Sequence, residues 1–160
     1  MKFSDYLQLN EENLGSAEVN FSSNSTENID RVDAPLQRIN MPQLTKELMG
    51  DFVSDLTLHG IPFKSDIYKR YDELLPVQGE LNKDKIKSIQ TSLESDKKYK
   101  LDPILISDDN KIVDGNHRWA AQKNSKMIPV NQVGLSFEKL YDFLMDKPYV
   151  LRRKIDEHKD

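Results

Sequence analysis

The chain has 160 residues and a formal net charge of -4 at pH 7, from 27 acidic and 23 basic side chains. A net acidic chain argues against a protein that coats nucleic acid, although it leaves room for a local basic patch. The sequence has no cysteine, which excludes disulfides, thiolate catalysis and cysteine zinc sites. No apolar run approaches the roughly 20 residues of a membrane helix, so we expect no membrane partner and a cytoplasmic location.

Residues 1–33 are expected to form a flexible N-terminal segment. Phe3, Tyr6, Leu7 and Leu9 can share one helical face, which predicts a short docking helix over residues 1–9 for a protein partner. A frayed terminus is the open alternative. Residues 10–33 are rich in Ser, Asn and Glu, a composition that buries too little apolar surface to offset the cost of ordering.

Residues 34–148 are expected to form one domain with its core over residues 72–134, followed by a charged tail at 149–160. The first helix of this domain is indicated by apolar residues at a spacing of four, namely Leu44, Leu48, Phe52 and Leu56. Gly60 can end this helix.

The later elements follow from the spacing of apolar residues and from turn residues. In chain order they are a strand at 61–68, an extended piece at 74–77, a helix from the N-cap Asn82 to Ser95, a strand at 103–106, a tight turn at 108–110, a return strand at 111–113, a helix at 117–124, a strand at 127–133 and a helix at 137–145. This mixed order predicts an α+β fold with a small mixed sheet flanked by helices.

The segment Asp114-Gly115-Asn116-His117-Arg118 joins a strand to a helix and is the strongest functional signal in the chain. Gly115 allows positive φ and a close approach of a ligand to the backbone. The start of the helix offers free N–H groups, and His117 and Arg118 add side-chain donors. This combination predicts a phosphate-binding turn. The open alternative is a tight turn whose Asp114 caps the helix and pairs with Arg118.

The helix after Asn82 carries a second set of polar side chains that could contact a ligand. At about 100° per residue, Lys85, Ser88 and Ser92 fall on one stripe, and apolar residues occupy a neighbouring stripe. The helix can therefore bury one side and present a cation and two hydroxyls to a ligand. The alternative is an ordinary solvated surface.

These residues lie in a stretch, 74–133, that resembles the ParB/sulfiredoxin-like superfamily. The matching segments are Pro76-Val77-Gln78-Gly79-Glu80-Leu81, Lys85-Ile86-Lys87-Ser88, Pro103-Ile104-Leu105-Ile106, the run from Ile112 to Ala121, and Ile128-Pro129-Val130. The pattern looks closest to small phage-encoded ParB-like proteins, which would place the chain in the host cytoplasm, and to the ADP-dependent serine kinase branch. The resemblance implies a ParB/sulfiredoxin-like fold with an extended N-terminal segment.

The resemblance also implies a nucleotide whose phosphates lie on the Gly-X-His-Arg turn. The nucleotide would be ATP or ADP, with CTP as a further option, together with Mg²⁺. The residues that would hold it are Gly115, Asn116, His117 and Arg118 on the turn, and Lys85, Ser88 and Ser92 on the preceding helix, as in sulfiredoxins.

Two departures narrow the range of functions within this superfamily. Sulfiredoxins need a Cys where this chain has Asn116, so repair of sulfinic acids is excluded. The stretch after Val133 is too short for both the helix-turn-helix and the dimerisation region of ParB proper, so centromere-type partitioning is not expected.

We therefore expect a nucleotide-dependent phosphotransferase or nucleoside-triphosphate hydrolase, with an unidentified small-molecule or macromolecular acceptor. Glu80 is the candidate general base or Mg²⁺ ligand. Asp114 and His117 complete the candidate catalytic set, with Asp114 as the second candidate Mg²⁺ ligand. The structural alternatives are a turn residue for Glu80 and a helix cap for Asp114.

Two other functions stay open. One is a ParB-like nuclease or DNA-modifying factor, supported by the basic stretches Lys97-Lys98-Tyr99-Lys100 and Arg152-Arg153-Lys154. The other is a non-catalytic binding or virion-associated module that attaches to a protein partner through residues 1–9.

Overall fold

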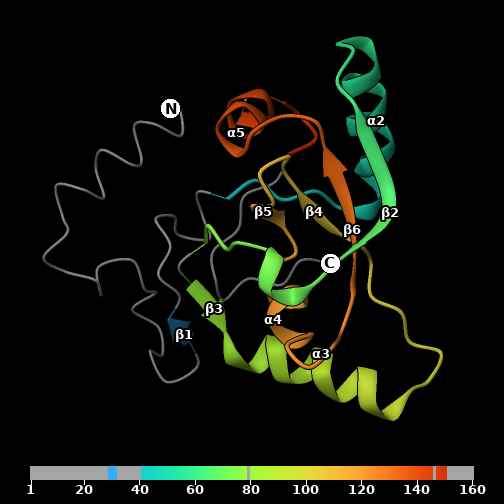
Figure 1. Ribbon diagram of the computed structural model, residues 1–160, viewed down its shortest axis with the longest axis vertical. Helices are drawn as coiled ribbons and strands as arrows, with labels where there is room; N and C mark the ends of the chain where they lie inside the picture. Colours follow the sequence, from blue (N-terminus) through green and yellow to red (C-terminus); the bar gives the residue numbers. More distant parts are fainter. Residues whose placement is uncertain (1–28, 32–40, 79, 146, 151–160) are drawn as a thin grey trace, which may run out of the picture.

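The computed structural model describes residues 29–31, 41–78, 80–145 and 147–150, and Figure 1 draws the remainder as a thin grey trace. The expected docking helix at 1–9 and the charged residues from 151 onward lie outside the described residues. Within the described ranges, no helix has the length and apolar character needed to span a bilayer.

The described elements form one mixed sheet, one small two-stranded ladder and helices. The strands are β1 (Ile29–Arg31), β2 (Phe63–Lys69), β3 (Glu80–Asn82), β4 (Ile104–Ile106), β5 (Ile112–Asp114) and β6 (Ile128–Val133); the helices are α2 (Met49–Leu58), α3 (Lys83–Ser95), α4 (Asn116–Ala121) and α5 (Phe137–Met145), with 3-10 turns at Lys46–Leu48 and Tyr71–Glu73. The sheet has the order β2-β6-β4-β5, with β4 parallel to β6 and the other pairs antiparallel. The α+β class is therefore confirmed for the described part of the chain.

Helices cover both faces of the four-stranded sheet (Figure 1). Phe52 of α2 and Leu140 of α5 share one buried cluster with Leu105. Ile86 of α3 belongs to a second cluster, which contains Ile104. Successive strand residues point to opposite faces, which explains why Ile104 and Leu105 contribute to different clusters. The sheet is therefore the middle of three layers and has a core on each face.

Two helices begin where local signals place them. Asn82 is the N-cap of α3, and its side chain accepts hydrogen bonds from the N–H groups of Asp84 and Lys85 at 2.9 and 3.2 Å. The apolar spacing that predicts the last helix matches α5 from Phe137 to Met145. Both predictions are confirmed, because capping and periodicity depend on residues within one or two turns.

The start of the first helix differs from the expectation. Helix α2 begins at Met49 rather than near Leu44, after a 3-10 turn. The Leu44 N–H donates to the distant carboxylate of Asp114 at 3.1 Å, which holds this part of the chain outside the helix.

Strand pairing around Glu80 also differs from the expectation. Glu80, expected in a turn, begins β3, which pairs antiparallel with β1 so that Arg31 lies opposite Glu80. Strand β1 falls inside the segment whose composition predicts flexibility. Pairing with a strand far along the chain supplies backbone partners that local composition does not reveal.

The chain after α5 returns to α2 and packs against it. Tyr149, inside the expected tail, is buried, and its hydroxyl donates to Asp55 at 2.7 Å. The Nζ of Lys147 lies 2.9 Å from the same carboxylate. Hydrogen bonding from Lys147, and next from Tyr149, holds the pKa of Asp55 below its ordinary value. Residues 147–150 therefore contribute to the packing of this domain.

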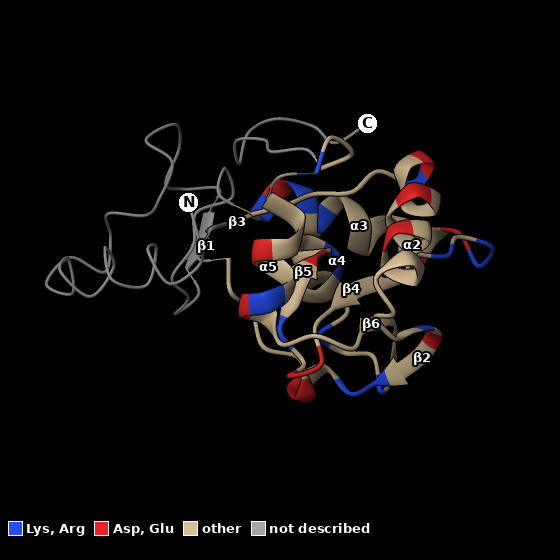
Figure 2. Ribbon diagram, turned by 90° about the horizontal axis from the view of Figure 1, so that it is seen from above, with Lys and Arg blue, Asp and Glu red and all other residues tan. Residues whose placement is uncertain are grey.

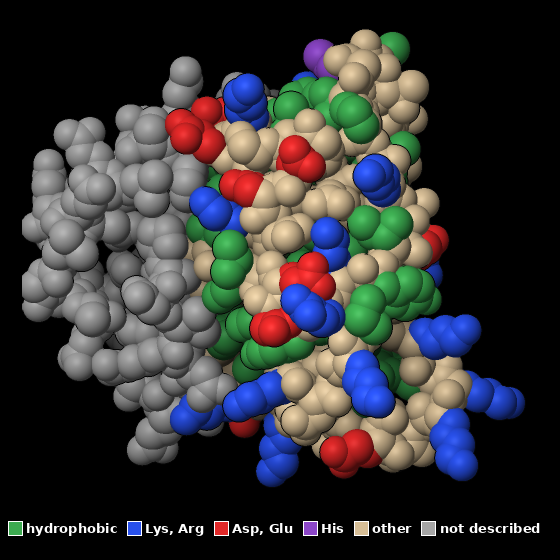
Figure 3. All heavy atoms as spheres, viewed as in Figure 1, with side chains coloured by type: hydrophobic (Ala, Val, Ile, Leu, Met, Phe, Trp, Pro, Cys, Tyr) green, Lys and Arg blue, Asp and Glu red, His purple; other side chains and the backbone are tan. Residues whose placement is uncertain are grey.

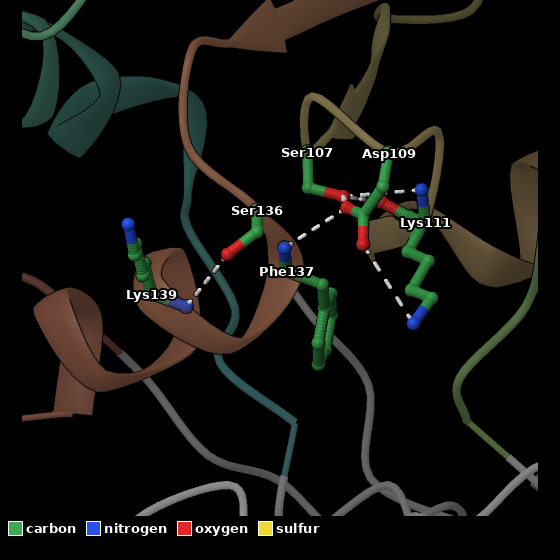
Figure 4. Close-up of polar contacts among 6 residues, drawn as sticks. All are labelled: Ser107, Asp109, Lys111, Ser136, Phe137 and Lys139. Carbon is green, nitrogen blue, oxygen red and sulfur yellow. Dashed lines mark hydrogen bonds and ion pairs between the residues drawn. The ribbon is translucent and has the colours of Figure 1, made fainter.

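The turn between β4 and β5 fixes the start of α5 (Figure 4). Asp109 accepts hydrogen bonds from the Ser107 hydroxyl and from the Phe137 N–H, the latter at 2.9 Å. The Nζ of Lys111 lies 3.7 Å from the second carboxylate oxygen. Burial acts to raise the pKa of Asp109, but the hydrogen bonds from Ser107 and Phe137 hold the pKa below its ordinary value.

Replacing Asp109 with alanine is expected to lower the free energy of unfolding at pH 7 by about 0.5–2 kcal/mol, the usual effect of losing a helix-capping side chain. A carboxyl with a depressed folded-state pKa stabilises the fold above its unfolded value, about pH 4, and this contribution is lost as the pH falls through the folded value. Denaturant titrations should therefore show a smaller difference in the free energy of unfolding between wild type and Asp109→Ala at pH 3 than at pH 7. The exposed neighbour Asp108 is the control, and Asp108→Ala should change stability little. Equal losses for the two variants would contradict the capping role.

Candidate functional site

A cavity of about 1040 Å³ opens beside the strand-to-helix turn at residues 114–118. Its wall comes from the segment before α2, the first half of α3, the segment before β4 and the turn into α4. Ligand pockets commonly enclose about 300–1,000 Å³, so this cavity is at the upper end of the range. It therefore has room for more than a single small group.

Gly115 makes the turn from β5 into α4. Its φ is +105°, in the left-handed region that favours glycine. The guanidinium of Arg118 folds back over it, so that a Cβ added to Gly115 would lie 2.9 Å from Nη2. Glycine is required here both for the backbone conformation and for the space that the arginine occupies.

Two backbone carbonyls anchor the guanidinium of Arg118. Its Nη1 donates to the carbonyl of Asp102 at 3.0 Å and to that of Pro103 at 3.1 Å. Within the described residues, no hydrogen bond uses its Nη2 or Nε. Because an arginine carries N–H donors on all three nitrogens, the anchored side chain keeps donors for a ligand at the cavity wall.

His117 links the two helices that border the cavity. Its Nε2 accepts a hydrogen bond from the backbone N–H of Asn82, the N-cap of α3, at 2.9 Å. While this bond is present, Nε2 carries no proton and cannot donate to a phosphate. The bond connects the turn to the start of α3 across 35 residues of sequence.

Aromatic stacking fixes α4 on its other side. The rings of Trp119 and Tyr71 are parallel, with centroids 4.6 Å apart. The indole N–H of Trp119 donates to the Tyr71 carbonyl at 3.2 Å, and burial raises the pKa of Tyr71. Trp119 is therefore a packing residue that holds the turn in place.

Asp114 is buried on the wall of the cavity, where only 7% of its surface is exposed. Its carboxylate accepts the Leu44 N–H, which draws the segment before α2 across the cavity. Asp114 lies opposite Leu105 in the ladder, and Leu105 lies opposite Asn131 of the neighbouring strand. The three residues line one edge of the cavity together.

The predicted stripe on α3 is brought to the cavity in part. Lys85 and Ser88 line it beside the turn. In the described cavity Ser92 is not a wall residue, and its hydroxyl donates to the Ser88 carbonyl at 3.1 Å. The cation and the first hydroxyl are therefore placed to meet a ligand, and the second hydroxyl bonds within its own helix.

The two predicted Mg²⁺ ligands belong to different elements. The backbone of Glu80 lies in β3, two residues before the cap of α3, and Asp114 ends β5. In the described part of the chain, no group of three or more His, Asp or Glu side chains could hold a metal ion. A resident metal site built from the protein alone is therefore not found there, and metal binding by Glu80 and Asp114 stays a prediction.

Other parts of the wall were not predicted from the sequence. They are the segments at 44–47 and 99–103, together with Asn131 of β6. The sequence signal in this part of the wall is Tyr99 within a lysine-rich stretch, a pattern that indicates a nucleic-acid patch rather than a cavity wall. Among the described residues, the wall carries four cations (Lys46, Lys85, Lys100 and Arg118) and four carboxylates (Glu47, Asp84, Asp102 and Asp114). Such a balanced wall favours a ligand set that has both anionic and hydrogen-bond-donating groups.

No protein-family profile, curated protein or solved structure matches the chain. Function is therefore inferred from the geometry of this cavity and from the similarity of residues 74–133 to the ParB/sulfiredoxin-like pattern.

Proposed function

We propose that this protein is a ParB/sulfiredoxin-like nucleotide-binding protein that catalyses phosphoryl transfer or nucleotide hydrolysis. The observation that carries the proposal is the anchored guanidinium of Arg118, which shares one cavity with Lys85 and Ser88. A cationic fork held by the protein before the ligand arrives needs little reorganisation to bind phosphate oxygens.

The residues of the turn and of α3 have separate roles in this proposal. Arg118 and the backbone N–H groups near Asn116 bind the terminal phosphate, and Lys85 neutralises further phosphate charge. Ser88 hydrogen-bonds the nucleotide from α3. His117 acts indirectly, since its bond to the Asn82 N–H sets the distance between the turn and α3. Phosphoryl transfer depends mostly on positioning and charge stabilisation, which such a wall can supply.

Mg²⁺ fits this cavity best as a companion of the nucleotide. Magnesium sites that act on nucleotides commonly use one or two carboxylates and the substrate's phosphates. The buried Asp114 carboxylate is the described donor for such an ion, and it already accepts the Leu44 N–H. The ion would neutralise phosphate charge. Glu80, in the strand that leads to the cap of α3, remains the proposed general base.

The proposal is tested by calorimetry with ATP, ADP, CTP and GTP in the presence of Mg²⁺. Replacing Lys85 with glutamine should weaken binding of the tightest-binding nucleotide by about three- to tenfold, or roughly 0.7–1.4 kcal/mol. Lys87→Gln is the matched control, because Lys87 is an exposed lysine on the same helix that does not line the described cavity. Failure of all four nucleotides to bind wild type, or equal weakening by both variants, would contradict nucleotide binding in this cavity.

The runner-up function is a nuclease or DNA-modifying factor. Figure 3 shows basic side chains gathered over the end of the molecule that α3 forms, and Figure 2 shows acidic positions on α2. Exposed lysines of this region include Lys83, Lys87, Lys97 and Lys98. Cleavage of plasmid with Mg²⁺ or Mn²⁺ would favour this function. Nucleotide binding with neither turnover nor cleavage would favour a non-catalytic binding module.

A further inference from the structure

The face of the sheet that α2 covers is open at one end. Ile67 of β2 lies opposite Val130 of β6, and both pack with the cluster on the α3 side. The adjacent residues of these strands, Tyr68 and Pro129, also lie opposite each other, and the alternation of a strand turns them toward the face of α2. Tyr68 is nevertheless 61% exposed, so α2 does not cover this part of the face.

The exposed apolar surface continues from Tyr68 toward the cavity. Met127, which immediately precedes β6, is 49% exposed. Pro103 and Pro129 each stand one residue before a paired position of the parallel strands β4 and β6, so the sheet places them side by side. Tyr99, Leu101 and Pro103 also line the cavity. We call this surface the Tyr68 patch; it consists of Tyr68, Tyr99, Leu101, Pro103, Met127 and Pro129.

The Tyr68 patch concentrates the apolar side chains that the fold leaves in solvent. It holds three of the five large hydrophobic side chains that are exposed in the described part of the chain. Figure 3 shows hydrophobic side chains on this side of the molecule, with basic side chains below them. Exposed apolar groups gathered together and bordered by polar residues are typical of an interaction surface.

The charges next to the Tyr68 patch are basic. Lys98 and Lys100 flank Tyr99 in the chain, Lys126 precedes Met127, and all three lysines are exposed. Within the described ranges, none of them forms an ion pair, whereas the Nζ of Lys147 lies 2.9 Å from Asp55. Cations that the protein leaves unpaired beside an apolar surface favour a partner with negative charge.

The composition of the patch favours a protein over the other anionic partners. Four of its six residues have no aromatic ring, so the patch has little flat surface on which bases could stack. The nearby Arg70 is already paired, with its Nε 3.0 Å from Glu73. A second copy of this chain fits poorly, because a symmetric contact would bring the same lysines of both copies together. Tyrosine and methionine are enriched in protein interfaces.

We propose that the Tyr68 patch binds an acidic segment of a partner protein. Apolar side chains of the segment cover Tyr68 and Met127, and its carboxylates pair with the lysines at 98, 100 and 126. This docking surface goes beyond the proposed nucleotide chemistry and does not depend on it. Its continuity with the cavity wall through Tyr99 and Pro103 places the bound segment beside the cavity.

The test selects binders from a displayed library of random dodecapeptides, with the full-length protein as bait. We expect the enriched peptides to be net acidic and to contain apolar residues. Tyr68→Ser and Met127→Ser should each weaken binding of the best peptide, made synthetically, by about fivefold or more in fluorescence anisotropy. Leu75→Ser is the matched control, because Leu75 is also 49% exposed but lies outside the patch. Thermal unfolding checks that each variant is folded.

The charge contribution is measured with the same peptide. Lys126→Gln should weaken binding and reduce its dependence on NaCl, whereas Lys139→Gln, at an exposed lysine of α5, should do neither. Basic or neutral enriched peptides, or equal weakening by Leu75→Ser and Tyr68→Ser, would overturn the inference. So would an oligothymidylate that displaces the peptide, or a dimer of the protein that Tyr68→Ser abolishes. No nucleotide is present in these measurements, so their failure leaves the proposed function intact.

Discussion

Replacing Gly115 with alanine is expected to lower the free energy of unfolding by about 1–3 kcal/mol and to weaken nucleotide binding by tenfold or more. The backbone cost arises because φ at this position is +105°. The effect on binding arises because the added Cβ would lie 2.9 Å from Nη2 and 3.2 Å from Cζ of Arg118, so the guanidinium must move from its carbonyl anchors. Urea titration measures the first effect, and calorimetry with Mg²⁺ and the best nucleotide measures the second.

Substitutions at two other glycines are controls that distinguish the effect of backbone strain from the effect of disturbing the site. Gly60 has φ +66°, and a Cβ there meets no atom within 4 Å, so Gly60→Ala should cost stability without changing nucleotide affinity. Gly50 lies in α2 with equally open space, and Gly50→Ala should raise the free energy of unfolding by up to about 1 kcal/mol. If Gly115→Ala and Gly60→Ala have the same effects on stability and on binding, the close packing of Arg118 on Gly115 has no functional role.

Arg118→Ala is expected to weaken nucleotide binding by tenfold or more, about 1.5–3 kcal/mol, because it removes a charged, hydrogen-bonding phosphate contact. Arg118→Lys should recover only part of the affinity. A single ammonium cannot hold both carbonyl anchors and still present a planar fork to phosphate oxygens. Calorimetry on the three proteins measures the difference, with urea titration as a check that each is folded.

Arg70 is the matched control for this arginine. It is exposed, and its Nε lies 3.0 Å from Glu73, outside the described cavity wall. Arg70→Ala should leave nucleotide affinity unchanged. Unaltered affinity in Arg118→Ala would remove the main support for phosphate binding at the turn, and the nucleic-acid function would then become the better explanation.

Much of the secondary structure was predictable from the sequence because it depends on near neighbours. Asn82 caps α3 through residues two and three positions away. The spacing of Phe137, Leu140, Tyr141 and Leu144 predicted α5 because those residues share one buried face. The glycine at position 115 was likewise identifiable, since an Asp-Gly pair between a strand and a helix predicts a positive φ.

The candidate site was predictable only in part, for a reason of distance along the chain. Lys85, Ser88 and the turn were proposed together from spacing and resemblance, and the cavity does bring them together. The segments at 44–47 and 99–103 were missed as wall residues because no local pattern relates them to the turn. Ser92 was assigned a ligand contact that helical spacing allows, although its hydroxyl bonds to the Ser88 carbonyl.

The sequence by itself determined the α+β class, the bounds of α3 and α5, and the presence of a glycine turn rich in donors. Tertiary structure decided how that turn is used. The Leu44 N–H reaches Asp114 across 70 residues, and the Asn82 N–H reaches His117 across 35. Tertiary structure also decided that the guanidinium of Arg118 donates to a backbone carbonyl, whereas the Asn116 amide has no partner among the described residues. Capping and periodicity act over one helical turn, whereas these contacts exist only after the sheet has brought distant segments together.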